Sequence, residues 1–196
     1  MKLITCLLRV NMSLLRKNGD YAAVAGQQGA NTAPSIRHER TFMSFESEIQ
    51  SCKWLFMNSI SEPSDNELRL QIFEAVTGPA SPDTFGPLNE SLDLNLPLGS
   101  PIEHVTGCRI FTLHWPSYVA YSVRNESYTT VDNYEIFEGR NFVKYSKSRY
   151  LDFVRDATFA DDNFPGPMTH WGIFCLNHII DIVSRHHPEV SISAEK

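Results

Sequence analysis

The sequence predicts an α+β fold, in which a mostly antiparallel sheet of six or seven strands carries one main helix on one face. Several short runs alternate apolar and polar residues between clusters of turn formers, which is typical of strands. A run that ends near Ala157 instead repeats its apolar residues with the period of a helix. The chain has 196 residues, of which 42% are hydrophobic, so it can fold around a core of its own.

Residues 1–43 are predicted to be a disordered or dispensable leader, followed by a single domain at 44–192 and a tail at 193–196. The first 17 residues hold no acid and carry apolar residues at helical spacing, so a short basic targeting helix is the alternative. Residues 18–42 are too rich in Gly, Ala, Gln, Ser and Thr to order themselves. The sequence shows neither a convincing secretion signal nor a run of about 20 apolar residues that could span a membrane. We therefore expect a cytoplasmic protein.

The first patterned segment, Cys52 to Ala75, predicts a hairpin. Apolar residues alternate on both sides of a stretch dense in turn formers, residues 61–66. A helix from Phe45 to Asn58, capped by Ser44, is the alternative, because apolar residues there also fit a 3.6-residue period.

The segment from Thr77 to Gly107 predicts a long loop, because it holds five of the eleven prolines. Loops of this length inside a domain are often functional, so a binding rim is expected there. Beyond it, strands are predicted at 108–114, 118–124 and 142–145. A helix capped by Ser146 or Ser148 follows, with an apolar stripe that includes Leu151, Phe153 and Val154.

The last patterned run, His170 to Ser184, predicts a second hairpin that turns at Asn177-His178 and pairs Phe174 with Asp181. Its β-branched residues favour strands, and alternation then puts Cys175 and Asp181 on opposite faces. If the run were a helix, Cys175, His178 and Asp181 would share one side.

Candidate catalytic residues are Cys175, His178, His170 and Asp181. A cysteine nucleophile needs an exposed thiolate beside a base, whereas Cys175 lies between Phe174 and Leu176, as a buried structural cysteine would. A small hydrolase or transferase that uses His170, Cys175 or His178 is nevertheless the alternative function.

Neither a metal nor a cofactor is expected. The clusters Asp161-Asp162 with His170 and His186-His187 match no ligand spacing, and the sequence has no GxGxxG, Walker A, HExxH or GxSxG motif. The four cysteines stand singly, without the CxxC pairs of zinc and redox sites, which fits a reducing cytosol.

A recognition surface is predicted where aromatic and polar residues interleave. Tyr and Arg combine a large contact area with hydrogen-bonding tips. The candidate binding residues are Tyr121, Arg124, Glu126, Tyr128 and Tyr145.

The partner is expected to be a protein, and a basic one. Residues 1–42 hold six Lys/Arg against two acids, whereas the remainder holds 11 basic residues against 21 acids, a net charge of −10. A body this acidic repels phosphate backbones, so nucleic acid is not expected as a partner.

Four segments resemble a family of small, uncharacterised bacterial proteins of unknown function: NSISEPSDNELRLQIFEA, AYSVRNESY, YSKSRYLDFV and GIFCLNHIIDIVS. The resemblance spans about Phe45 to Val190 and implies a stand-alone cytosolic bacterial domain, but it brings no catalytic residues with it. We therefore expect a non-enzymatic protein-binding module. By analogy of size and charge, an immunity-like protein that neutralises a toxin is one form that it could take.

Overall fold

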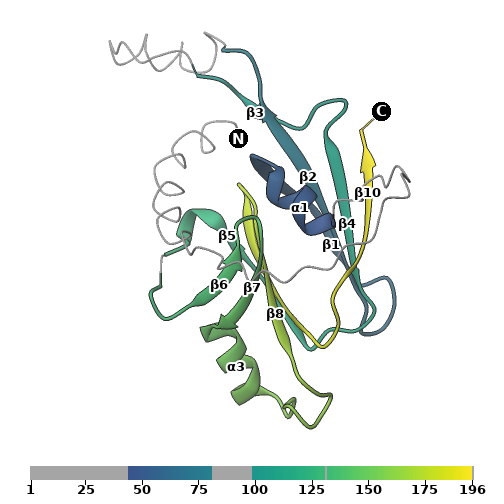
Figure 1. Cartoon of the computed structure of the whole chain (residues 1–196), viewed down its shortest axis with the longest axis vertical. Coiled ribbons are helices and arrows are strands. Elements are labelled where there is room, and N and C mark those ends of the chain that lie inside the picture. Colours follow the sequence, from purple (N-terminus) through teal and green to yellow (C-terminus); the bar gives the residue numbers. More distant parts are fainter. Residues whose placement is uncertain (1–43, 81–98, 131, 196) are drawn as a thin grey trace, which may run out of the picture. The chain divides into compact units, whose positions relative to one another are not determined.

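Two antiparallel sheets of five strands each form the domain (Figure 1). The computed structural model describes residues 44–80, 99–130 and 132–195. Antiparallel sheets combined with helices agree with the predicted fold class. The prediction of one sheet of six or seven strands with one main helix is wrong, since the described residues form ten strands in two sheets and two α-helices. The predicted leader lies outside the described residues, as does most of the predicted Pro-rich loop.

The first sheet has the order β1-β2-β4-β10, and a short β3 also pairs with β2. Its strands are β1 (Trp54–Ser61), β2 (Leu68–Thr77), β3 (Ile102–Glu103), β4 (Arg109–Trp115) and β10 (Glu189–Ala194). Strands β1 and β2 form the predicted hairpin. The two interpretations of the segment before it each hold in part, because helix α1 (Phe45–Ser51) ends just before β1 begins.

The second sheet has the order β5-β9-β8-β7-β6. Its strands are β5 (Ala120–Asn125), β6 (Ile136–Gly139), β7 (Phe142–Lys147), β8 (Thr169–Phe174) and β9 (His178–Ser184). Strands β5 and β6 occupy opposite edges, although they are neighbours in the sequence. Their connection begins with the short 3-10 helix η4 (Glu126–Tyr128).

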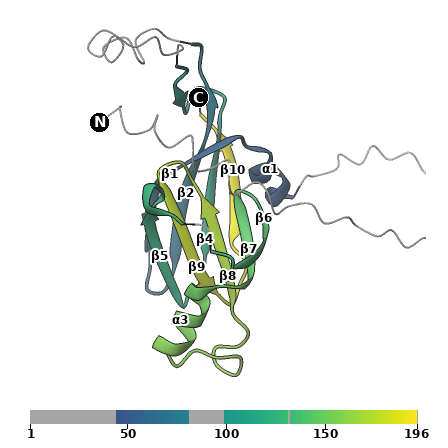
Figure 2. The same ribbon diagram turned by 90° about the vertical axis from the view of Figure 1, so that its left-hand side faces the viewer.

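A shared hydrophobic core lies between the two sheets, which Figure 2 shows as two layers. Alternate residues of the longer strands point into this core, as the two-residue period of a strand requires. The first sheet contributes Leu55, Leu68, Leu70, Ile72, Phe111, Leu113 and Trp115, and the second contributes Phe142, Trp171, Ile173, Ile180 and Ile182.

Helix α3 (Arg149–Ala157) covers part of the outer face of the second sheet. The Ser148 hydroxyl accepts the Leu151 N–H at 3.0 Å, so Ser148 is the helix cap, one of the two that the sequence predicts. Leu151 and Val154 pack against Val183 of β9 in a second, smaller core.

The terminal hairpin forms from β8 and β9, so the helical alternative for 170–184 is wrong. Its register differs by two residues from the predicted one, because Asp181 pairs with Gly172 rather than with Phe174. A shift of two keeps every side chain on its face. Cys175 therefore lies in the core, and Asp181 lies on the opposite face.

Candidate functional site

Two of the candidate catalytic residues, His170 and Asp181, meet on the outer face of the second sheet. They stand on the neighbouring strands β8 and β9, and His170 Nε2 lies 3.1 Å from Asp181 Oδ1. Both are buried, with exposed fractions of 0% and 1%. Buried polar groups need partners, so the groups around this pair decide what it can do.

A continuous chain of contacts runs from the helix cap through this pair to the surface; we call it the polar relay: Ser148, His170, Asp181 and Arg124. Ser148 Oγ lies 2.7 Å from His170 Nδ1. At the other end, Arg124 Nε donates to Asp181 Oδ2 at 3.1 Å, and Arg124 Nη2 forms an ion pair with the same oxygen at 2.9 Å. Because Asp181 can only accept, the relay places the His170 ring proton on Nε2 and lets the Ser148 hydroxyl donate to Nδ1.

The order Ser–His–Asp is that of a hydrolytic triad, but the geometry of Ser148 does not fit a nucleophile. Its side chain is 0% exposed, and its oxygen already accepts the Leu151 N–H. A nucleophile must reach a substrate, whereas this hydroxyl is enclosed between helix and sheet. The relay therefore holds α3 on the sheet.

Two tyrosines enclose the relay. Tyr145 stacks on the His170 ring with 4.1 Å between centroids, and Tyr150 lies at 5.4 Å from the same ring. Burial raises the pKa of Tyr145 and raises that of Tyr150 to about 12. Both phenols therefore stay neutral at physiological pH.

The other candidate catalytic residues lie elsewhere. Cys175 is 1% exposed in the core, and burial raises the pKa of its thiol. His178 is half-buried at the start of β9, and its Nδ1 has no hydrogen-bond partner among the described residues. The structure thus unites His170 with Asp181 and leaves Cys175 apart from both.

The predicted binding residues do not form one surface. Tyr121 points toward the first sheet, where its hydroxyl donates to Glu62 at 2.9 Å. Glu126 is buried, Tyr145 lies under the relay, and Arg124 is half-exposed beside Asp181. Tyr128 is 84% exposed and stands apart from these contacts.

Three exposed phenylalanines lie on α3 and the loop after it; we call this set the phenylalanine cluster: Phe153, Phe159 and Phe164. Their exposed fractions are 61%, 84% and 62%. Phe159 and Phe164 stack on each other at 5.8 Å, and Phe153 stacks on Tyr150 at 6.3 Å. The predicted apolar stripe of the helix includes Phe153, whereas Phe159 and Phe164 lie in an acidic, turn-rich loop, and two phenylalanines in such a loop are the signal that could have indicated the cluster.

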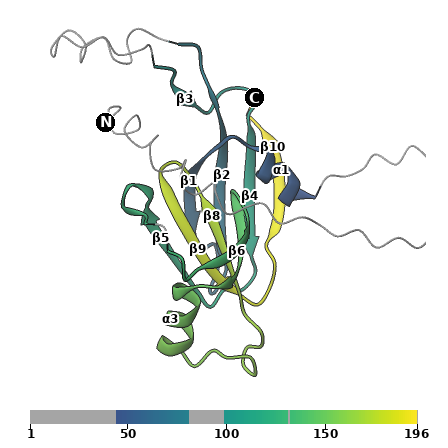
Figure 3. The same ribbon diagram turned by 60° about the vertical axis from the view of Figure 1, so that its left-hand side comes forward.

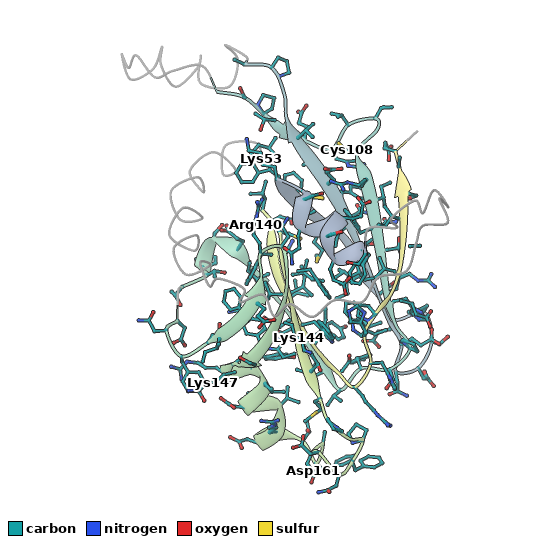
Figure 4. The ribbon with its side chains drawn as sticks, in the orientation of Figure 1. Lys53, Cys108, Arg140, Lys144, Lys147 and Asp161 are labelled. Atoms are coloured by element: carbon teal, nitrogen blue, oxygen red, sulfur yellow. The ribbon has the colours of Figure 1, made fainter. Side chains whose placement is uncertain are left out.

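An aspartate shapes this loop. Asp161 Oδ1 accepts the N–H groups of Asn163 and Phe164 at 2.7 and 2.8 Å, and these donors lower the pKa of Asp161. Figure 4 shows Asp161 in the loop that follows α3. Residues 150–167 hold four aspartates against one arginine, a net charge of −3, so the phenylalanine cluster lies in an acidic setting.

Two shallow depressions also lie on the described surface. One, of about 560 Å³, lies on the polar face of the first sheet around Gln71, Thr112 and His114. The other, of about 400 Å³, lies beside α1 over Phe142 and Trp171. Neither brings three metal-binding side chains together, and no such group occurs elsewhere among the described residues.

Comparisons of the chain with protein-family models, with curated proteins and with solved structures found no match. Within the described ranges, no helix has the length and hydrophobicity to cross a membrane. A functional proposal for this chain therefore rests on its own geometry and charge.

Proposed function

We propose that this domain is a non-enzymatic protein-binding module that binds a basic partner through the phenylalanine cluster. The observation that carries the proposal is the exposure of Phe159 and Phe164, which stack on each other in a loop shaped by Asp161. A contiguous apolar patch with a polar rim is the usual mark of an interaction site.

The free energy available at the phenylalanine cluster is large enough for binding. Full burial of one phenylalanine side chain contributes about 1.5–3 kcal/mol. Aromatic residues are also the most frequent energetic centres of protein interfaces. Stacked rings that are already held in place lose little side-chain entropy when a partner covers them.

Charge supports a basic partner. The local charge of −3 has the same sign as the −10 of residues 43–196. Complementary charge raises the rate of association and selects among partners. The immunity-like form of this function, with a basic toxin as the partner, rests on size and charge alone.

The test compares two surfaces. A Phe159→Ser/Phe164→Ser variant and a Tyr128→Ser control, equally aromatic and 84% exposed, are used to capture proteins from a bacterial lysate. The captured protein is then purified and titrated by calorimetry at low and high salt. We expect the double variant to bind at least tenfold more weakly, the control to bind as the unmodified chain does, and binding to weaken as salt rises.

Two results would contradict the proposal. If Tyr128→Ser abolishes capture and the phenylalanine variant does not, binding occurs at the surface predicted from the sequence. If salt leaves the affinity unchanged, the partner is not selected by charge.

A further inference from the structure

Strand β10 forms an edge of the first sheet (Figure 3). It pairs with β4 over six consecutive residues without a bulge. No other strand among the described residues pairs with its second edge. Such an edge offers a row of free N–H and C=O groups to another strand.

The hydrogen bonds of Glu195 show which residues face this free edge. Glu195 N–H donates to the Cys108 carbonyl at 3.0 Å, and the Gly107 N–H donates to the Glu195 carbonyl at 3.1 Å, so both groups of Glu195 point toward β4. Backbone direction alternates along an antiparallel strand. The N–H and C=O groups of Val190, Ile192 and Ala194 therefore point outward.

The other sheet edges are protected. On β1, Asn177 bonds the Met57 N–H and C=O at 2.9 Å each, and the Leu176 N–H bonds the Leu55 carbonyl. Strand β6 has only four residues and an irregular register, and β5 carries Arg124. Residues 190–194 of β10 read VSISA, with none of the charges, prolines or bulges that keep an edge from pairing.

We infer that β10 pairs with β10 of a second copy of this chain, antiparallel about a two-fold axis at Ile192. Other centres also match outward-facing groups, but this one pairs the most of them, because it includes Val190, Ile192 and Ala194 of both strands. It pairs Ile192 with its own copy and Val190 with Ala194, so each of these pairs can exchange both hydrogen bonds. Ile192, 42% exposed in the single chain, then lies against the same residue of the copy.

The pairing is self-complementary, which favours a second copy over a foreign strand. Ser191 faces Ser193, a small and uncharged pair. One unfavourable contact remains at each end, where Glu189 faces Glu195. Like charges directly opposite each other destabilise a strand pair by about 0.2–1 kcal/mol. Removal of that charge should therefore strengthen the dimer.

The experiment measures the mass of the full chain by sedimentation over a range of concentrations. We expect the mass to rise from 22.3 kDa toward twice that value. Ile192→Pro removes an outward N–H and no bond to β4, so it should fold normally and stay monomeric. Ser191→Pro is the matched control, because it removes an N–H that points to β4 and should lower the melting temperature instead.

A second variant keeps the test independent of any folding defect. Glu189→Gln should lower the dimer dissociation constant about two- to thirtyfold, because one repulsive pair is lost at each of the two ends of the interface. A monomer at every concentration, for both the unmodified chain and Glu189→Gln, would overturn the inference. So would a dimer that survives Ile192→Pro, or one that disappears only when Phe159 and Phe164 are replaced.

Discussion

Replacement of Asp181 by alanine removes the central acceptor of the polar relay. Asp181 is 1% exposed, and it receives contacts from His170 at 3.1 Å, Arg124 at 2.9 Å and Ser122 at 3.4 Å. In Asp181→Ala, the Nε2–H of a fully buried histidine has neither a partner nor access to water. An unsatisfied buried donor of this kind is costly.

The expected cost follows from burial. A buried donor left without a partner, as His170 Nε2–H is in this variant, costs about 1–3 kcal/mol. Arg124 is half-exposed, so water replaces part of its lost contact and it adds little to this cost. At about 2–4 °C per kcal/mol for a chain of this size, we expect the melting temperature to fall by roughly 2–12 °C.

Thermal unfolding, followed by tryptophan fluorescence, measures this change, and Asp162→Ala provides the control. Asp162 is also an aspartate near an arginine, but its side chain is 72% exposed and 3.9 Å from Arg155, so its loss should cost less than about 0.5 kcal/mol. The stability of Asp181→Asn should lie between those of Asp181→Ala and Asp162→Ala, because the amide keeps an acceptor for His170 but has no charge for Arg124. Equal stabilities of Asp181→Ala and Asp162→Ala would refute the reasoning.

Four further predictions concern stability. Removal of residues 1–42 should shift the melting temperature by only a few degrees, because both described cores lie within 44–195; loss of soluble folding would contradict this. Cys175→Ser should lower the free energy of unfolding by about 1–3 kcal/mol, because it puts a polar hydroxyl in the core, and Cys175→Ala should cost less than this polar penalty. Rapid labelling of the native thiol would contradict this, because it would show that Cys175 is exposed. Glu126→Gln should stabilise the fold at pH 7, because desolvation raises the pKa of this buried carboxyl and its Oε2 has no hydrogen-bond partner among the described residues. The gain should shrink as the pH falls through the raised pKa and vanish below the ordinary pKa of a glutamate, where Glu126 is protonated in both the folded and the unfolded chain. Glu74→Gln should lower the free energy of unfolding by about 2 kcal/mol at pH 7, because the Arg109 hydrogen bonds lower the pKa of Glu74. The difference in stability between the variant and the unmodified chain should disappear as the pH falls through that lowered pKa. A difference that persists in acid would show that the lowered pKa is not its origin.

The sequence predicts α3 well because its signals are local. The Ser148 cap and the buried Leu151 and Val154 lie within one short stretch, and each appears in the structure as expected. Phe153 belongs to the same stripe, yet it is 61% exposed. The sheet determines how many residues of the apolar stripe are buried, and the periodicity of the helix carries no information about the sheet.

The arrangement of the sheets depends on contacts between distant residues. Strands β5 and β6 are neighbours in the sequence but lie at opposite edges of one sheet. Asn177 lies in the turn between β8 and β9, where its amide bonds Met57 of β1. A contact over 120 residues leaves no trace in local patterns, and the predicted hairpin register was wrong by two residues at this place.

The polar relay shows the same limit for the candidate site. His170 and Asp181 were candidates by residue type, and the hairpin that joins them was expected. Their partner Ser148 was predicted only as a helix cap. Its contact with His170 exists because α3 packs on the outer face of the second sheet, which the sequence does not reveal.

The relay also links the stability of the domain to its proposed binding surface. Ser148 holds the start of α3 against His170, and the phenylalanine cluster lies on that helix and the loop after it. A change in the relay that leaves the domain folded should therefore loosen α3 and weaken partner binding, although no relay residue belongs to the cluster. The variant His170→Gln tests this. Its partner affinity is compared with that of the unmodified chain well below the melting temperature, where the contribution of the relay to stability does not affect the comparison. A full loss of relay contacts with unchanged partner affinity would show that the cluster keeps its shape without the relay, held by Leu151 and Val154 alone.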